Sequence, residues 1–217
     1  MLEKKFIKKE LYVFLEKMFV LKDKFANKFY PLTVARKSTK YAKKHFDLIY
    51  GFNYKLNVCE VGSYTGMNAG NILNVLPVNK MYIVDGWEEG YAGTNVEKSC
   101  RKYLSWRKNQ VVIIKKLSDE AVDDIPDDSI DFLYIDADHS YEWVKKDLNN
   151  YWGKVRENGI IGGHDYTGLC PDVIKAVNEF AEERGLHLFT RLEDYWFVKG
   201  KIVVPLFLST HGVVEMI

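Results

Sequence analysis

The sequence predicts a doubly wound α/β domain in which a mostly parallel sheet is covered by helices on both faces. Two observations lead to this fold class. From residue 56 onward, short apolar runs alternate with longer stretches that have helical periodicity. The runs are apolar on both sides of the strand, which is typical of parallel strands buried between two layers of helices.

Five of the apolar runs are expected to form the parallel strands, and the stretches between them the crossover helices. Two further runs lie only four residues apart, a spacing that suits a hairpin and predicts an antiparallel strand near one edge of a seven-stranded sheet. The expected strands are 56–61, 81–84, 111–114, 130–135, 159–163, 186–190 and 195–199, with helices at 67–76, 95–107, 141–155 and 171–185.

Residues 1–50 are expected to form a basic helical extension. Apolar residues recur at helical spacing over 3–28, Pro31 ends that pattern, and Ser38 precedes a second helix at 40–50. Residues 1–46 have a net charge of +9, whereas the remainder of the chain has −8. Such asymmetry is found in arms that bind nucleic acid or anionic membranes, but also in solvated helices that dock on an acidic body.

Composition is typical of one soluble domain, with 47% hydrophobic and 28% charged residues among 217. Cys59, Cys100 and Cys170 are odd in number and widely spaced, which predicts neither a zinc site nor a disulfide framework but a reducing, cytoplasmic setting. We expect no membrane span and no signal peptide. The expected division is an extension at 1–50, a main domain at 51–200 and an apolar segment at 201–217.

A glycine turn follows the first expected strand. Gly62 and Gly66 allow the backbone to turn tightly and approach a ligand, and the following helix start offers N–H donors. Glu60 stands before the glycines, where it would attract a cationic ligand and repel a phosphate. The G-x-G-x-x-G pattern of dinucleotide-binding proteins is absent, which disfavours an NAD-dependent oxidoreductase.

A second acid, Asp85, ends the second expected strand, about 20 residues beyond the glycines. A carboxylate at this place can accept hydrogen bonds from the hydroxyls of a ribose, as nucleotide-type cofactors require. We expect the following Gly86 and Trp87 to shape the adenosine pocket, although core packing explains Trp87 equally well.

Acids and histidines follow the fourth and fifth expected strands. Neighbouring parallel strands lie about 4.8 Å apart, so side chains at their carboxyl ends can converge on one ion. Asp136, His164 and Asp165 are the candidate ligands, leaving positions for water and substrate oxygens. The alternative is that single acids here act as helix caps or local hydrogen-bond partners, as we expect for Asp138, and that Asp165 caps the turn before Gly168.

The turn from Glu60 to Gly66 resembles the E/D-x-G-x-x-x-G motif of class I methyltransferases, which have a Rossmann-like seven-stranded sheet. The resemblance implies that Glu60, Gly62, Ser63 and Gly66 hold the methionine part of S-adenosylmethionine. It also implies that Ser118 and Asp119, just past the third strand, contact the adenine. We assign Asp136 to the cofactor site as well as to the metal site.

The segments 135–141 and 162–166 resemble a more specific group, the metal-dependent O-methyltransferases of the catechol, caffeoyl-CoA and macrocin types. Their pattern I-D-x-x-H and G-H-D-Y implies that Asp136 and Asp165 bind Mg²⁺, or Mn²⁺ or Ca²⁺ in its place. His139 matches the catalytic base, and a neutral imidazole can deprotonate an acidified hydroxyl. His164 stands where the macrocin type has a second acid.

The expected function is therefore methyl transfer from S-adenosylmethionine to a hydroxyl of a small molecule or sugar. A metal-independent N-methyltransferase or RNA methyltransferase remains an alternative, with the basic extension gripping phosphates. A non-catalytic binding module that retains the fold is another. The sequence identifies neither the acceptor nor the oligomeric state, and a homo-oligomer is left open.

Overall fold

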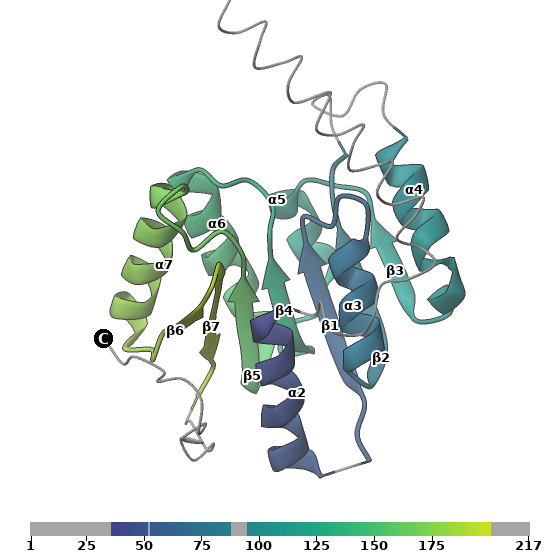
Figure 1. Ribbon diagram of the computed structural model, residues 1–217, viewed down its shortest axis with the longest axis horizontal. Helices are drawn as coiled ribbons and strands as arrows, with labels where there is room; N and C mark the ends of the chain where they lie inside the picture. Colours follow the sequence, from purple (N-terminus) through teal and green to yellow (C-terminus); the bar gives the residue numbers. More distant parts are fainter. Residues whose placement is uncertain (1–35, 52, 88–94, 201–217) are drawn as a thin grey trace, which may run out of the picture. The chain divides into compact units, whose positions relative to one another are not determined.

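The computed structural model describes residues 36–51, 53–87 and 95–200, so the helix expected at 3–28 and the segment 201–217 lie outside the described residues. The described chain forms a seven-stranded sheet in the order β3-β2-β1-β4-β5-β7-β6, drawn in Figure 1. The strands are β1 (Leu56–Val61), β2 (Val78–Val84), β3 (Val111–Ile114), β4 (Ile130–Ile135), β5 (Val155–Gly163), β6 (Phe189–Arg191) and β7 (Asp194–Val198).

The five strands from β1 to β5 are parallel, whereas β7 pairs antiparallel with both β5 and β6. This arrangement confirms the predicted fold class, including the antiparallel hairpin at one edge. Because β1 lies in the middle of the parallel part, the chain leaves β1 toward one side of the sheet and later crosses to the other side at β4. Ligands in open α/β sheets bind near such a reversal of strand order.

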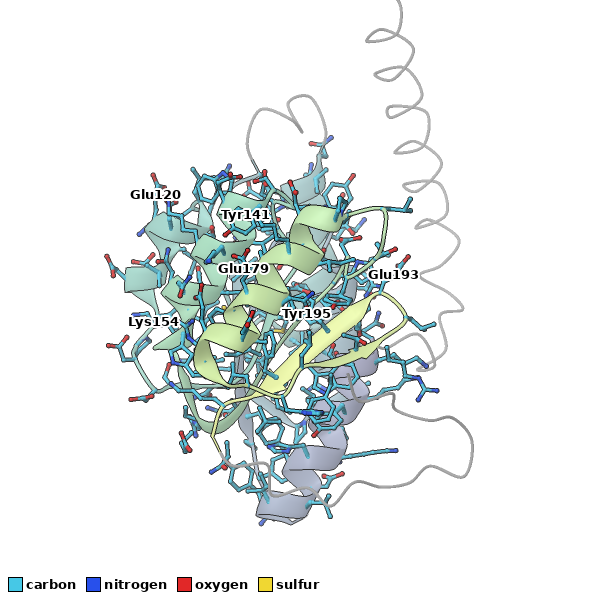
Figure 2. All side chains as sticks on the ribbon, turned by 90° about the vertical axis from the view of Figure 1, so that its left-hand side faces the viewer. Glu120, Tyr141, Lys154, Glu179, Glu193 and Tyr195 are labelled. Carbon is cyan, nitrogen blue, oxygen red and sulfur yellow. The ribbon has the colours of Figure 1, made fainter. Side chains whose placement is uncertain are left out.

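Helices cover both faces of the sheet (Figure 1). One face carries α2, α3 and α4, and the other carries α5, α6 and α7. Figure 2 shows Tyr141 and Glu179 on the neighbouring helices α6 and α7, where the phenol donates a hydrogen bond of 2.6 Å to the carboxylate. The helices are α2 (Lys37–Tyr50), α3 (Met67–Val75), α4 (Val96–Tyr103), α5 (Ser118–Ala121), α6 (Tyr141–Trp152) and α7 (Pro171–Arg184), with 3₁₀ turns at Leu104–Arg107 and Val122–Asp124.

Alternating strand residues supply the two cores. Val58 and Phe132 pack with α2, α3 and α4, while their neighbours Cys59 and Leu133 pack with the helices on the opposite face. All four side chains are fully buried. Successive side chains of a strand point to opposite faces, so burial on both sides requires the continuous apolar runs seen in the sequence.

Element boundaries differ from the expected ones mainly where the strands carry polar residues. β5 begins at Val155 rather than at residue 159, because the polar residues 156–158 still belong to the strand although they hid it from a hydrophobicity pattern. The helix expected at 95–107 is divided into α4 and a 3₁₀ turn, and the short helix α5 was not expected. None of the described helices is both long enough and apolar enough to cross a membrane.

The start of α2 is anchored to the far edge of the sheet. The helix begins at Lys37, so Ser38 lies in its first turn instead of before it. The Ser38 N–H and hydroxyl both donate to Oδ2 of Asp194, at 3.0 and 3.1 Å, and both residues are buried. Gly162 of β5 permits this approach, since a Cβ there would lie 3.1 Å from the Ser38 Cβ. The residue before α2 is thereby held close to the end of β5.

We predict that Ser38→Ala lowers the free energy of unfolding by about 1.5 to 3 kcal/mol, the usual loss for a buried hydrogen bond to a charged group. Chemical denaturation of the full chain measures it. Ser105→Ala is the matched control, because that hydroxyl donates to the Lys102 carbonyl on an exposed surface and should change stability by less than about 0.5 kcal/mol. Equal effects of the two substitutions would show that the anchor does not stabilise the fold.

Candidate functional site

The parallel register brings the predicted site residues together at the carboxyl ends of the parallel strands. Val61 is paired with Val84 on one side and with Ile135 on the other, and Ile135 is paired with Gly163. These four residues end their strands, so the loops that follow begin side by side. The glycine turn, Asp85, Asp136 and the His164–Asp165 pair therefore lie in one region, as the strand pattern predicted.

The glycine turn packs directly against the loop that carries Asp136. Gly62 has a left-handed backbone (φ 84°), and a Cβ on it would collide with the Asp136 carbonyl. Gly66, also left-handed (φ 80°), immediately precedes α3. Only glycine adopts these angles without strain and allows such a close backbone approach. The candidate cofactor site and the candidate metal site are therefore adjacent, because the glycine turn of the first contacts the loop of the second.

Glu60 is a buried acid with a free acceptor. Its side chain is 1% exposed, Oε1 accepts a hydrogen bond of 2.7 Å from Asn68, and Oε2 has no partner among the described residues. Burial raises the pKa of Glu60 to about 7, opposed by the side chains of Ser63 and Asn68 and assisted by the charges of Asp136 and Asp85. A cationic group would both satisfy Oε2 and favour the ionised form. Asn68 was missed, because nothing in the sequence links it to Glu60.

Asp85 holds the glycine turn from the neighbouring strand. Its Oδ2 accepts from the Tyr64 N–H at 2.7 Å and its Oδ1 from the Trp87 N–H at 2.8 Å, while the Trp87 indole donates to the Tyr64 carbonyl at 2.9 Å. Burial raises the pKa of Asp85, although these backbone bonds oppose the rise. Trp87 also packs against a core cluster, so the structure supports the packing interpretation of this residue. The Asp85 carboxylate still has acceptor capacity for a ligand, since it offers about four lone-pair sites.

Ser118 and Asp119 begin the short helix α5, beyond the end of β3. The Ser118 carbonyl accepts a bond of 2.8 Å from the Tyr151 hydroxyl, and Oδ2 of Asp119 pairs with Lys146 at 2.7 Å. Oδ1 of Asp119 is buried and has no partner within the described segments. This oxygen can accept a hydrogen bond from a ligand, which is compatible with the expected contact with an adenine.

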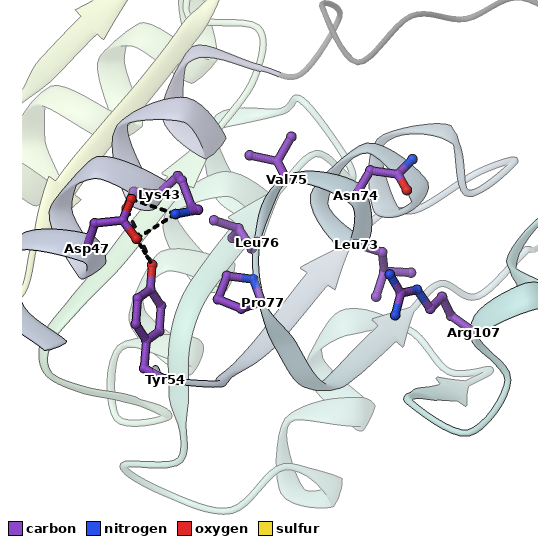
Figure 3. A pocket seen from close by; sticks show the side chains of 9 residues that line it. All are labelled: Lys43, Asp47, Tyr54, Leu73, Asn74, Val75, Leu76, Pro77 and Arg107. Atoms are coloured by element: carbon purple, nitrogen blue, oxygen red, sulfur yellow. Dashed lines mark hydrogen bonds and ion pairs between the residues drawn. The ribbon is translucent and has the colours of Figure 1, made fainter. Parts of the chain in front are cut away.

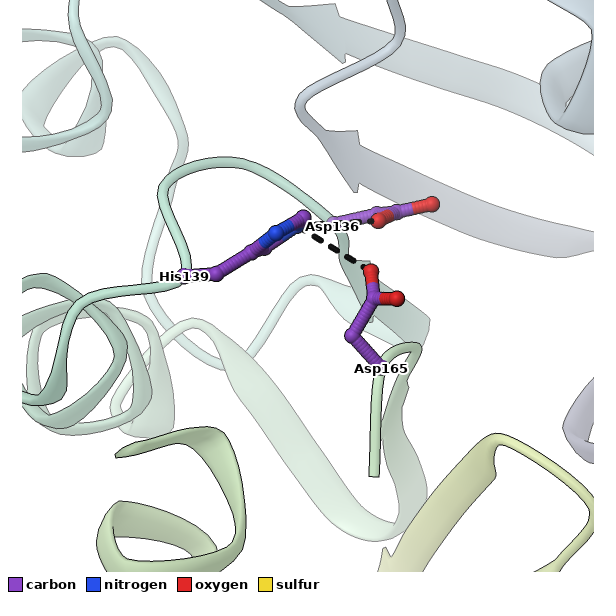
Figure 4. Close-up of side chains that lie close together, drawn as sticks. All are labelled: Asp136, His139 and Asp165. Atoms are coloured by element: carbon purple, nitrogen blue, oxygen red, sulfur yellow. Dashed lines mark ion pairs between the residues drawn. The ribbon is translucent and has the colours of Figure 1, made fainter. Parts of the chain in front are cut away.

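Asp136, His139 and Asp165 form a compact group at the ends of β4 and β5 (Figure 4). One ligand atom of each lies within 4.8 Å of the others. His139 Nε2 is 3.1 Å from Asp165 Oδ2 and 3.7 Å from Asp136 Oδ1. The carboxylate of Asp136, together with the charges of Asp165 and Asp138, raises the pKa of His139 despite partial burial. The hydrogen bond from His164 lowers the pKa of Asp165.

This group differs from the ligand set expected from the sequence, because it includes His139 and leaves out His164. His164 lies behind Asp165, with Nδ1 at 3.1 Å from Asp165 Oδ2. Its Nε2 faces Arg36 Nη1 at 2.5 Å and Glu193 Oε2 at 3.2 Å. Arg36 and Glu193 were not expected at the site, since they come from the start of α2 and from the β6–β7 turn. No sequence pattern linked Arg36 and Glu193 to His164, because all three lie in different segments of the chain.

Asp138 and the pocket found in the structure both lie outside this group. Asp138 accepts hydrogen bonds from the Ser140 N–H and hydroxyl just before α6, a local hydrogen-bonding role that leaves it outside the candidate metal group. A pocket of about 300 Å³ lies at the amino-terminal ends of β1 and β2, at the opposite strand ends from Asp136 and Asp165 (Figure 3). It contains none of the expected site residues. Its walls are Lys43, Asp47, Tyr54, Leu73, Asn74, Val75, Leu76, Pro77 and Arg107.

The strand order, the acid-led glycine turn and the carboxylate after β2 together define a class I methyltransferase domain of the S-adenosylmethionine-dependent kind. Residues 59–166 match a sequence family described as a methyltransferase domain. The matched segment runs from β1 to the loop after β5 and includes every candidate site residue of the sequence analysis.

Two uncharacterized proteins match part of the chain. The chain is 31% identical over 139 residues to the uncharacterized protein R132 of Acanthamoeba polyphaga mimivirus, covering 59% of this chain and 60% of that one. It is 28% identical over 120 residues to the uncharacterized protein y4gI of Sinorhizobium fredii, covering 54% of this chain and 12% of that one. The chain thus spans less than two thirds of either relative.

Among solved structures, a putative caffeoyl-CoA O-methyltransferase from Staphylococcus aureus has a TM-score of 0.57 at 17% identity, covering 89% of this chain and 100% of that one. The O-methyltransferase NovP also has a TM-score of 0.57, at 21% identity, with coverage of 75% and 79%. At these identities the likeness concerns the fold.

We predict that Glu60→Gln stabilises the ligand-free protein at pH 8 by about 1 to 3 kcal/mol but hardly at pH 4.5. The raised pKa of Glu60 means that wild-type stability is highest below the unfolded pKa and falls as pH rises through about 7. Glutamine retains the Asn68 contact and never ionises. Thermal unfolding across this pH range measures the difference.

The same substitution should weaken binding of S-adenosylhomocysteine about tenfold or more, because a buried charge partner for its ammonium is lost. Isothermal titration calorimetry measures this affinity. Glu97→Gln is the control: Glu97 is paired with Arg101 and Lys115 on the surface, so its replacement should neither stabilise the protein at pH 8 nor weaken cofactor binding. A stability gain in both variants would refute the role of burial.

Proposed function

We propose that the protein transfers a methyl group from S-adenosylmethionine to a hydroxyl oxygen of a small molecule or sugar, assisted by a divalent metal ion such as Mg²⁺. The main support is the group of Asp136, His139 and Asp165, which lies beside the glycine turn. A reacting hydroxyl held by this group would be close to a cofactor held by the turn. The O-methyltransferases among the structural neighbours have the same fold.

The cofactor would bind at the carboxyl ends of β1, β2 and β3. Glu60 offers its unpaired Oε2 to the ammonium of the methionine part, and the backbone of Gly62, Ser63 and Gly66 surrounds that part. Asp85 accepts from the ribose hydroxyls with its remaining lone pairs. Gly86 and Trp87 border the adenosine, and Asp119, next to Ser118, accepts from the adenine amino group through Oδ1.

Two carboxylates on neighbouring loops suit a hard divalent cation. Mg²⁺, Mn²⁺ and Ca²⁺ prefer oxygen ligands, which Asp136 and Asp165 provide. His139 fits a different role, because it is 46% exposed and its ring is directed toward both acids. When bound, the metal ion would acidify the acceptor hydroxyl. His164 faces away toward Arg36, so we propose Asp136 and Asp165 alone as the metal ligands from this chain.

The chemistry required of the side chains is modest, since the sulfonium is a good leaving group. The acceptor oxygen attacks the methyl carbon in line as the bond from that carbon to sulfur breaks. The electron pair stays on sulfur, which leaves as neutral S-adenosylhomocysteine, and the hydroxyl proton passes to Nε2 of His139. The protein contributes orientation of the two reactants and removal of this proton.

The basic extension favours a second candidate, methylation of RNA. Residues 1–46 have a net charge of +9, which suits contacts with phosphates. RNA binding that weakens steeply as salt increases, together with methylation that is unaffected by a chelator, would favour this candidate over the metal-assisted one.

We predict that methylation of a hydroxyl acceptor is abolished by a chelator and restored by Mg²⁺ or Mn²⁺. Asp165→Asn should reproduce most of the loss, because it removes a charged ligand while preserving size. Asp138→Asn is the matched control, a neighbouring acid that accepts hydrogen bonds from the Ser140 N–H and hydroxyl. Turnover with S-adenosylmethionine in the presence and absence of chelator measures the effect. Full activity in excess chelator would overturn the metal proposal.

We predict that His139→Ala lowers kcat by about 10² to 10⁴, the range typical for loss of a positioned base, while cofactor affinity stays nearly constant. In the wild type the rate should rise with pH through the histidine pKa, which the neighbouring acids raise above its ordinary value, and then level off. Lysine at this position should retain part of the activity. A normal rate in the alanine variant would exclude His139 as the base.

A further inference from the structure

Arg36 reaches the site from outside the sheet. It directly precedes α2, and its Nη1 lies 2.5 Å from Nε2 of His164, which is 128 positions away in the sequence. Its backbone is fixed by the next turn of helix, where Ser38 is bonded to the buried Asp194. The guanidinium is therefore placed by a buried anchor and by the close approach at Gly162.

The contact with Arg36 requires one particular tautomer of His164. A guanidinium has only donors, so Nε2 of His164 must accept the bond from Arg36. A neutral imidazole that accepts at Nε2 has its proton on Nδ1. Nδ1 lies 3.1 Å from Oδ2 of Asp165, which accepts that proton's hydrogen bond. Arg36 thus selects the tautomer in which His164 donates to Asp165.

Glu193 favours the other tautomer of His164, with the proton on Nε2. Its Oε2 is 3.2 Å from the same Nε2 of His164, and its side chain is 54% exposed. A carboxylate only accepts, so Glu193 favours a proton on Nε2, the opposite of what Arg36 requires. If Arg36 were absent, the ring could donate to Glu193 and leave Asp165 without its donor. The two residues therefore act on one nitrogen in opposite senses.

Asp165 connects this pair to the reaction site. Its Oδ2 lies 3.1 Å from His164 Nδ1 and also 3.1 Å from His139 Nε2. We infer that Arg36 is a positioning residue, which fixes the tautomer of His164 and thereby the orientation of the Asp165 carboxylate toward His139 and a metal ion. The consequence for metal binding rests on the proposed function, whereas the tautomer of His164 does not.

The test compares four full-length variants with the wild type. Arg36→Ala removes the donor, and Arg36→Lys retains one. Lys37→Ala is the charge-matched control, since Lys37 is the next residue and makes no hydrogen bond or ion pair within the described part of the chain. The double variant Arg36→Ala with Glu193→Gln tests rescue, because a glutamine amide can donate to Nε2 where the carboxylate cannot.

The tautomer is measured in the metal-free protein by side-chain ¹⁵N NMR at about pH 8.5, where histidine is ordinarily neutral. His164→Gln identifies the signal among the five histidines. The wild type, Arg36→Lys and Lys37→Ala should have the proton on Nδ1, Arg36→Ala should move it to Nε2, and the double variant should return it to Nδ1. An Nδ1 proton in Arg36→Ala would overturn the inference.

Mn²⁺ affinity, measured by electron paramagnetic resonance, gives the second readout. Arg36→Ala should weaken it about 10- to 100-fold, as is usual when the partner of a metal ligand is removed, and Lys37→Ala should not. A changed tautomer with unchanged Mn²⁺ affinity would overturn the positioning role. If the wild type bound no Mn²⁺ but the tautomers changed as expected, the metal proposal would fail while the action of Arg36 on His164 would stand.

Discussion

The parallel register of β1, β4 and β5 is the constraint on which the site depends. Because Val61, Ile135 and Gly163 are paired across neighbouring strands, the three following loops start at the same level of the sheet. The backbone then brings them into contact, with the Asp136 N–H donating to the Val61 carbonyl at 2.8 Å and Gly62 packed on the Asp136 carbonyl. A slip of one residue would turn the side chains of a strand to the opposite face and separate these groups.

The loops at the carboxyl ends of the parallel strands carry polar groups whose hydrogen-bonding capacity is only partly used within the described part of the protein. Glu60 and Asp119 each retain a buried oxygen without a partner among the described residues. Leaving a buried acceptor unpaired costs about 1 to 3 kcal/mol, so such groups weaken the ligand-free fold. Their position around one loop cluster is understandable if a ligand with a cationic group and an amino donor completes them. The same two oxygen atoms would then lower the stability of the ligand-free protein and contribute to ligand binding.

The antiparallel edge of the sheet has a different role. β7 begins with Asp194, which anchors α2, and the turn before it carries Glu193, which faces His164; Figure 2 shows Glu193 at this turn. The helix and the turn therefore meet at the end of β5 and bring one cation and one anion to the same imidazole. Elements that lie outside the parallel core thus govern the electrostatics behind Asp165.

The sequence alone determined the fold class, the order of the elements and the loops in which the chemistry lies, because apolar runs and glycine turns are local patterns. Its expectations for Glu60, Gly62, Asp85 and Asp136 follow from their place at the end of a strand or directly after it. Only the tertiary structure decided which histidine joins the acids, since His139 and His164 both follow strand ends and differ in the direction of their side chains. Arg36, Asn68 and Glu193 emerged only from the structure, because their contacts depend on packing between segments that are distant in the chain.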